Sequence, residues 1–175
     1  MSPAVKGIEE KIDWVLYDSA TLGAADVFVT LFQQPFGQVG KRLPDTNLRS
    51  AGSMPGKQNF LVKAVTFHAQ PDVTKTLLVA LLKDAALDLK IGEKSYLQIP
   101  LQRITAGCGV QGLTTGTTIE LYHNGPGDPR AVFSLEKPIQ IDIQENFSIE
   151  LSWLTAPGVV KFWVCLEGTL SRAAQ

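Results

Sequence analysis

Residues 138–153, PIQIDIQENFSIELSW, alternate apolar and polar side chains with one interruption. The apolar positions are Ile139, Ile141, Ile143, Phe147, Ile149, Leu151 and Trp153. Because successive side chains of a β-strand point to opposite faces of the sheet, the alternation predicts two half-buried strands with one apolar face each. The polar residues 144–146 break the pattern, so a hairpin or a tight link is expected there. We expect the apolar faces to pack across a core against a facing sheet.

Similar strand patterns recur along most of the chain and are joined by turn-rich links. Further strands are expected at 13–17, 26–33, 59–70, 87–91, 94–101, 117–123, 131–136 and 159–168. Residues 26–33 and 59–67 are apolar on both faces, so each strand should either be central in its sheet or contact another subunit. The sequence has no internal repeat and no alternation of strands with helices. It therefore predicts an all-β fold, an antiparallel sandwich or barrel.

One short amphipathic helix is expected within residues 72–86. Four leucines there have the i, i+1, i+4, i+5 spacing of one helical face, and Asp72 or Thr74 can cap its start. Residues 34–58 are rich in Gly, Pro and Ser and predict a long loop. A loop of this length in a compact domain is usually functional or extended along a neighbour.

The length of 175 residues indicates one domain. We expect a loose N-terminal arm over residues 1–12, a single β-domain over residues 13–175, and a glycine-rich loop at 105–116. Only 19% of the residues are charged, against about 25% in typical globular proteins, which indicates that some surface is buried against partners.

The charge and hydropathy of the chain argue against two classes of partner. The net charge of −1 provides no basic field for nucleic acid, so no specific nucleic-acid binding is expected. No apolar run reaches the roughly 18 residues of a membrane span. The N-terminus lacks the apolar core of a secretion signal, so we expect synthesis in the cytoplasm, with both cysteines reduced.

Groups able to perform catalysis or bind metal are few and far apart. His68 and His123 each end a predicted strand, and neither they nor Cys108 and Cys165 have the close-paired spacing of structural zinc sites. The motif GCGVQG at 107–112 lacks both the Lys-Ser/Thr ending and the following helix of a phosphate-binding loop.

The acidic residues give no better indication of an active site. Asp142, Glu145 and Glu150 are the nearest approach to a glycosidase pair, but Asp142 and Glu150 should point away from the core. The sequence therefore predicts a binding or building module rather than an enzyme, with no cofactor and no small-molecule substrate.

Surface contacts are predicted from loop 34–58 and from the last strand. The loop contains basic residues that suit contact with an acidic neighbour better than nucleic-acid binding. Trp163 has the outward parity of the last strand, where an aromatic side chain often marks a contact surface. The candidates for subunit contact are Lys41, Arg42, Arg49, Met54 and Trp163.

Four strand-rich blocks resemble a known family when they are taken together. They are FLVKAVTFHAQPD (60–72), LDLKIGEKSYLQIPL (87–101), PIQIDIQENFSIELSW (138–153) and VKFWVCLEGTLSR (160–172). In order and spacing, residues 26–172 resemble the small single jelly-roll major capsid proteins of membrane-containing icosahedral bacteriophages. The resemblance rests on no catalytic motif.

This resemblance implies a jelly roll of two four-stranded sheets that assembles into capsomers on an icosahedral shell. The implied partners are further copies of the chain, other capsid proteins and an internal viral membrane, and the implied location is the virion, after synthesis in the host cytoplasm. Residues 1–12 and 34–58 would be the segments that link neighbours.

Two other hypotheses remain open. A carbohydrate- or receptor-binding β-sandwich, such as a phage spike or decoration domain, would use a pocket with aromatics such as Trp14, Tyr96, Tyr122 or Trp163. An enzyme on a cupin-like barrel would need several histidines and a carboxylate on adjoining strands, and the sequence offers only two distant histidines.

Overall fold

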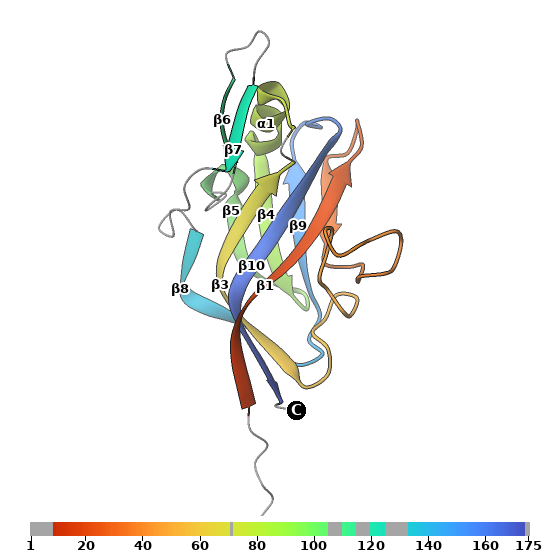
Figure 1. Cartoon of the computed structure of the whole chain (residues 1–175), viewed down its shortest axis with the longest axis vertical. Coiled ribbons are helices and arrows are strands. Elements are labelled where there is room, and N and C mark those ends of the chain that lie inside the picture. The colour runs from red at the N-terminus through yellow and green to blue at the C-terminus, as the bar shows by residue number, and fades with distance from the viewer. Residues whose placement is uncertain (1–8, 71, 105–109, 115–119, 125–132, 174–175) are drawn as a thin grey trace, which may run out of the picture.

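The computed structural model describes residues 9–70, 72–104, 110–114, 120–124 and 133–173. Within these residues, two four-stranded antiparallel sheets pack face to face (Figure 1). The first sheet has the order β1 (Glu9–Leu22), β10 (Val160–Ala173), β3 (Gln58–Ala69), β8 (Phe133–Ile141). The second sheet has the order β2 (Phe28–Leu31), β9 (Phe147–Trp153), β4 (Ala85–Ile91), β5 (Lys94–Pro100). A separate hairpin pairs β6 (Val110–Thr114) with β7 (Glu120–Asn124).

The strand order identifies the sandwich as a jelly roll. Along the chain, β1 to β4 cross from one sheet to the other at every step, β4 and β5 form a hairpin, and β8 to β10 cross again. The first and last strands of the described fold, β1 and β10, pair along their whole length. This winding of eight strands into two sheets is the jelly-roll arrangement. It confirms the predicted fold class, an all-β antiparallel sandwich with one short helix.

The two halves of the opening stretch belong to opposite sheets. β8 lies in the first sheet and β9 in the second, so residues 142–146 form a tight link between the sheets rather than a hairpin. Gln144 adopts a left-handed backbone (φ +59°), and the Glu145 N–H donates to the Asp142 carbonyl at 3.1 Å. The expectation that Ile143 is core was wrong: β8 ends at Ile141, and the Ile143 side chain is exposed.

The strand β8 joins two segments that the sequence pattern separated. Residues expected as a strand at 131–136 and the start of the opening stretch form one strand, Phe133–Ile141, which includes Pro138. Proline cannot donate to a ladder, and it is accommodated here because β8 is at the edge of the first sheet. The register of β8 against β3 shifts between Val62 and Ala64, where β8 carries extra residues: four of its residues (135–138) lie opposite one residue of β3.

The core lies between the sheets and is aromatic at its centre. Phe162 of β10 contacts Phe67 of β3 (5.2 Å between ring centroids) and Trp153 of β9 (6.0 Å). All three side chains are buried, as are the inward residues of β4 and β9 that surround them. The alternation of the opening stretch therefore packs across the sandwich, as predicted.

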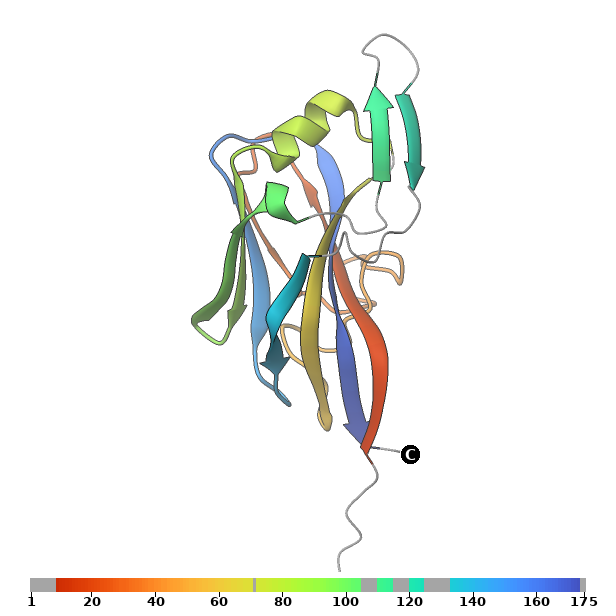
Figure 2. The ribbon, with the colours of Figure 1, turned by 90° about the vertical axis from the view of Figure 1, so that its left-hand side faces the viewer.

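The helix α1 (Lys75–Leu82) closes one end of the sandwich (Figure 2). The Thr74 hydroxyl caps it by accepting from the Leu77 N–H, and the Trp153 indole N–H donates to the Leu81 carbonyl at 2.8 Å. The helix is shorter than the predicted 72–86 because Asp84 adopts a left-handed backbone (φ +54°) and β4 begins at the next residue. A 3₁₀ turn, η1 (Leu101–Arg103), follows β5. None of the helices in the described part of the chain has the length and apolar character needed to cross a bilayer.

Three further boundaries differ from the predictions. β1 begins at Glu9, so residues 9–12 of the expected arm are part of a strand paired with β10. Residues 110–114, expected as loop, form β6. Of the two strands expected to be central or to contact another subunit, β3 is central in its sheet. β2 covers only residues 28–31 and lies at an edge.

Candidate functional site

The long loop between β2 and β3 binds along the free edge of β1. The Asn47 side-chain amide donates to the Val15 carbonyl at 2.7 Å and accepts from the Tyr17 N–H at 3.0 Å. The Asn47 N–H donates to the Tyr17 carbonyl at 3.3 Å, and Thr46 bridges to Asp18. Thr46 and Asn47 thus pair with β1 like a very short additional strand. They cover this part of an edge that would otherwise be open to pairing with another chain. This part of loop 34–58, a segment expected to be functional or to extend along a neighbour, is thus held by its own chain.

A buried ion pair anchors the start of this loop. The Asp18 carboxylate is 2% exposed and accepts from the Phe32 N–H at 2.6 Å and from the Lys41 ammonium at 2.7 Å. The ammonium also donates to the Ser19 carbonyl. Phe32 has a left-handed backbone (φ +65°), a costly conformation for a bulky residue, which the bond from its N–H to Asp18 helps to stabilise.

A second set of contacts joins the loop to the outer face of the first sheet. The Trp163 indole N–H donates to the Pro44 carbonyl at 2.8 Å. Lys161 forms an ion pair with Asp45, and its ammonium lies 5.0 Å from the centre of the Trp163 ring. The hydrogen bond from Lys161 is the main cause that lowers the pKa of the Asp45 carboxyl. The loop is therefore bound both to the edge of β1 and to the outer face of the first sheet.

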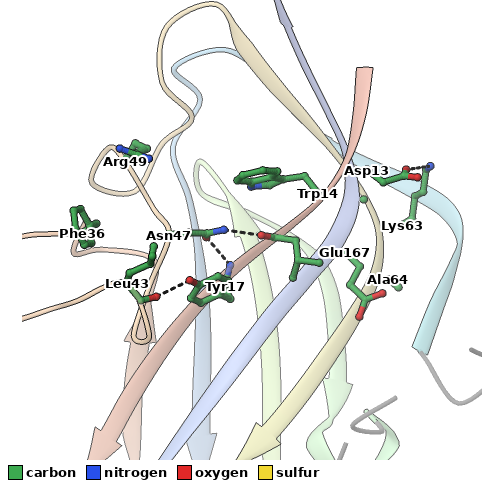
Figure 3. Close-up of a pocket in the computed structure, with 12 residues that line it drawn as sticks. Asp13, Trp14, Tyr17, Phe36, Leu43, Asn47, Arg49, Lys63, Ala64 and Glu167 are labelled. Atoms are coloured by element: carbon green, nitrogen blue, oxygen red, sulfur yellow. Dashed lines mark hydrogen bonds and ion pairs between the residues drawn. The ribbon is translucent and has the colours of Figure 1, made fainter. Parts of the chain in front are cut away.

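Between this loop and the outer face of the first sheet lies an open groove of about 730 Å³ (Figure 3). Its volume falls within the range of about 300–1,000 Å³ that is usual for ligand sites. Most of its lining is apolar, and the large apolar side chains come from β1 and the loop. The lining residues are Asp13, Trp14, Val15, Tyr17, Phe36, Leu43, Asn47, Arg49, Lys63, Ala64, Glu167 and Gly168.

The polar groups of the groove fall into two kinds. Tyr17 and Asn47 are bound to the chain, since the Tyr17 hydroxyl donates to the Leu43 carbonyl at 2.6 Å. The side chains of Arg49 and Glu167 make no hydrogen bond or ion pair with any residue that the structure describes, and they lie on the loop side and the strand side of the groove (Figure 3). The groove thus holds a free donor group and a free acceptor group.

Exposed apolar side chains also occur at the end of the sandwich that α1 closes. The links 23–27 and 154–159 meet there, because the Trp153 N–H donates to the Val27 carbonyl at 2.9 Å and the Leu154 N–H donates to the Asp84 carbonyl at 3.2 Å. We call this surface the loop-end patch, and its members are Val27, Phe28, Val79, Leu154 and Val159. Leu154, at 83% exposed, is the most accessible of them.

The five residues predicted for subunit contact differ in burial and in their contacts within the chain. Met54 is buried in the core and Lys41 is paired with Asp18, so neither side chain is free at the surface. Trp163 is half-buried beneath the loop. Arg42 and Arg49 are exposed, and Arg49 lines the groove. Their role in subunit contact stays a prediction.

Other residues considered from the sequence lie apart from the groove or outside the described residues. Tyr96 is exposed on β5 in the second sheet. Cys108 and the side chains of Tyr122 and His123 lie outside the described part. Of the aromatics proposed for a binding pocket, the groove contains Trp14.

The half-buried thiol and imidazole of the first sheet lie on its outer face. Burial raises the pKa of the Cys165 thiol to about 11, and burial lowers the pKa of His68. The His68 Nε2 lies 3.2 Å from the Thr66 hydroxyl. Within the described residues, no three or more His, Cys, Asp or Glu side chains cluster closely enough to hold a metal ion.

Sequence reasoning missed Asp18, Asn47 and Glu167. Asp18 had a detectable signal, since it occupies the inward parity of β1 between the apolar Leu16 and Ala20. Asn47 and Glu167 had none, because their roles depend on a loop and a strand that are far apart in the sequence. No protein-family model matches this chain, and no curated protein matches it either.

Proposed function

We propose that this chain is a structural subunit of a viral capsid, which assembles with copies of itself and with other capsid proteins into an icosahedral shell. The observation that carries the proposal is the loop-end patch on a jelly-roll sandwich. Jelly rolls serve in capsids, lectins and cupins, so the fold alone does not choose among these functions. The exposed apolar end favours a protein that buries this surface against a partner.

The physical argument rests on the apolar area that the patch leaves in water. Burying apolar surface is favourable by roughly 25 cal/mol per Å², and clustered exposed apolar side chains mark protein contact surfaces. The patch is formed by two links, the first residue of β2 and α1 at the same end of the molecule, so one contact can cover it. Closed symmetry then repeats each contact and multiplies its effect.

The composition supports the same function. With 19% charged residues, contacts between subunits desolvate few charges, and this desolvation is the main cost of a polar interface. Copies of the chain are therefore the partner that the patch suits best.

The proposal is tested by sedimentation and light scattering of the purified chain across protein concentration, with negative-stain imaging. We expect discrete oligomers, sheets or shells. Leu154→Ser should shift the chain toward monomer, because it places a polar group in the patch. Ile143→Ser is the matched control: it is also an exposed apolar residue, but it lies at the opposite end of β9, so assembly should be unchanged.

Thermal unfolding of both variants shows whether the fold is retained. A wild-type chain that stays monomeric at every concentration would contradict the proposal. Undiminished assembly by a folded Leu154→Ser variant would remove the patch from the interface.

A further inference from the structure

We propose that the groove on the outer face of the first sheet binds a neutral carbohydrate, with the Trp14 indole as the surface on which a sugar ring stacks. This binding site goes beyond the proposed assembly function and does not depend on it. The argument uses the exposure of Trp14, the free polar groups of the groove and the balance of its charges.

Trp14 offers an accessible aromatic face inside a concave surface. Its side chain is 42% exposed and lines the groove from β1. Its partner across the β1–β10 ladder is Gly168, which has no side chain that could cover the ring. The face of an indole carries negative charge, so it attracts the slightly positive C–H groups on the apolar face of a pyranose.

The free polar groups match the hydroxyls at the rim of a sugar. The Glu167 carboxylate can only accept hydrogen bonds and the Arg49 guanidinium can only donate them. Neither group has a hydrogen-bonding partner among the described residues. A hydroxyl does both, so an oligosaccharide that extends along the groove can meet an acceptor on the strand side and a donor on the loop side (Figure 3).

The charges of the groove favour a ligand without net charge. Arg49 and Lys63 are positive, Asp13 and Glu167 are negative, and the four sum to zero. Lys63 and Asp13 lie 3.9 Å apart at the exposed rim and largely balance each other. A cationic ligand would meet Arg49 and an anionic one would meet Glu167, so neither charge is favoured overall.

The wall of the groove is held in place before any ligand arrives. Tyr17 and Asn47 are bonded to the loop and the strand edge, and the Asp18–Lys41 pair anchors the loop below them. Such a preformed wall lowers the ordering cost of binding. An apolar segment from a second copy is a poorer occupant, because it would cover Arg49 and Glu167 without giving either a partner.

The test probes the purified chain on an array of neutral and acidic glycans, followed by titration calorimetry with free oligosaccharides. The free probes are lactose, N-acetyllactosamine, cellobiose and maltotriose, with sialyllactose as the acidic comparison. We expect at least one neutral glycan to bind. Trp14→Ala and Glu167→Gln should each weaken that binding about tenfold or more, as expected for contacts at the centre of a site.

Tyr96→Ala is the matched control, because Tyr96 is also an exposed aromatic but lies on the second sheet. It should bind the same glycan as well as the wild type does. Three results would each overturn the proposal: no neutral glycan binds, only sialyllactose and other acidic glycans bind, or a folded Trp14→Ala variant binds unchanged. Self-association that Trp14→Ala abolishes, without glycan binding, would assign the groove to a second copy instead. Leu154→Ser should leave glycan binding intact, which separates this test from the test of assembly.

Discussion

Replacing Asp18 with alanine removes the carboxylate that anchors the long loop. The change leaves the Lys41 ammonium, only 17% exposed, without its counter-charge, and it leaves the Phe32 N–H without an acceptor. Removing one partner of a buried ion pair costs about 3–5 kcal/mol. An unsatisfied buried N–H costs about 1–3 kcal/mol by itself, so it falls within that figure. We therefore expect Asp18→Ala to lower the free energy of unfolding by about 3–5 kcal/mol.

A double-mutant cycle isolates the ion pair from the other effects. Asp18→Asn keeps an acceptor for the Phe32 N–H but removes the charge, and Lys41→Met removes the ammonium but keeps the aliphatic chain. The double variant should lose less stability than the sum of the two single variants, by about 1–3 kcal/mol, because no buried charge is left unpaired. Lys63→Met breaks an exposed ion pair at 3.9 Å and serves as the control, with an expected change within about 0.5 kcal/mol.

The assay is urea unfolding followed by tryptophan fluorescence, at a protein concentration low enough to prevent assembly. Limited trypsin digestion adds a local readout, since Arg42 and Arg49 lie in the loop and should be cleaved faster in Asp18→Asn. A loss below about 1 kcal/mol in Asp18→Ala, or additive single variants, would refute the reasoning that this pair is buried and coupled.

The other predictions concern the core, a close backbone contact and a pH effect. Trp153→Ala should lower the free energy of urea unfolding by about 3–5 kcal/mol and Trp153→Phe by about 1–2 kcal/mol, since Phe keeps most of the packing but loses the bond to the Leu81 carbonyl. Equal losses would mean that the hydrogen bond contributes nothing. Gly168→Ala should cost about 1–3 kcal/mol in the same assay, because a Cβ there would lie 1.9 Å from the Leu61 carbonyl oxygen; unchanged stability would contradict this packing. Burial lowers the pKa of His68 in the folded state, so the unfolded chain takes up a proton first as the pH falls through about 6.5, and stability is lost from there downward. His68→Gln should therefore lose less stability than the wild type between about pH 7 and pH 5, and parallel pH profiles would exclude this effect.

Much of the strand content was predictable because side-chain alternation is a local property. The alternation of adjacent residues predicts which positions of 147–153 and of β10 face the core. The structure buries the apolar side chains at these positions, as expected. The helix was predictable from leucine spacing and its start from the capping residue Thr74, one of the two caps expected. Its C-terminal end was not, because it depends on the left-handed backbone of Asp84, after which β4 begins.

The candidate site was predictable only in part. Trp14 was among the aromatics proposed for a pocket, and the loop was expected to be important. Its neighbours in the groove, Arg49 and Glu167, lie in a loop and a strand that the sequence alone does not bring together. Met54 was proposed as a contact from its place in the loop, yet the fold buries it in the core.

The sequence by itself therefore determined most of the strand segments, β6 excepted, and which of their faces are apolar, since both depend on neighbours two residues away. Only the tertiary structure decided that residues 142–146 cross between sheets instead of closing a hairpin, because pairing in a sheet is set by contacts between distant segments. The same holds for the groove: Asn47 meets β1 about thirty residues earlier in the chain. Hydrogen bonds of this kind depend on how the sandwich winds, and no local pattern encodes them.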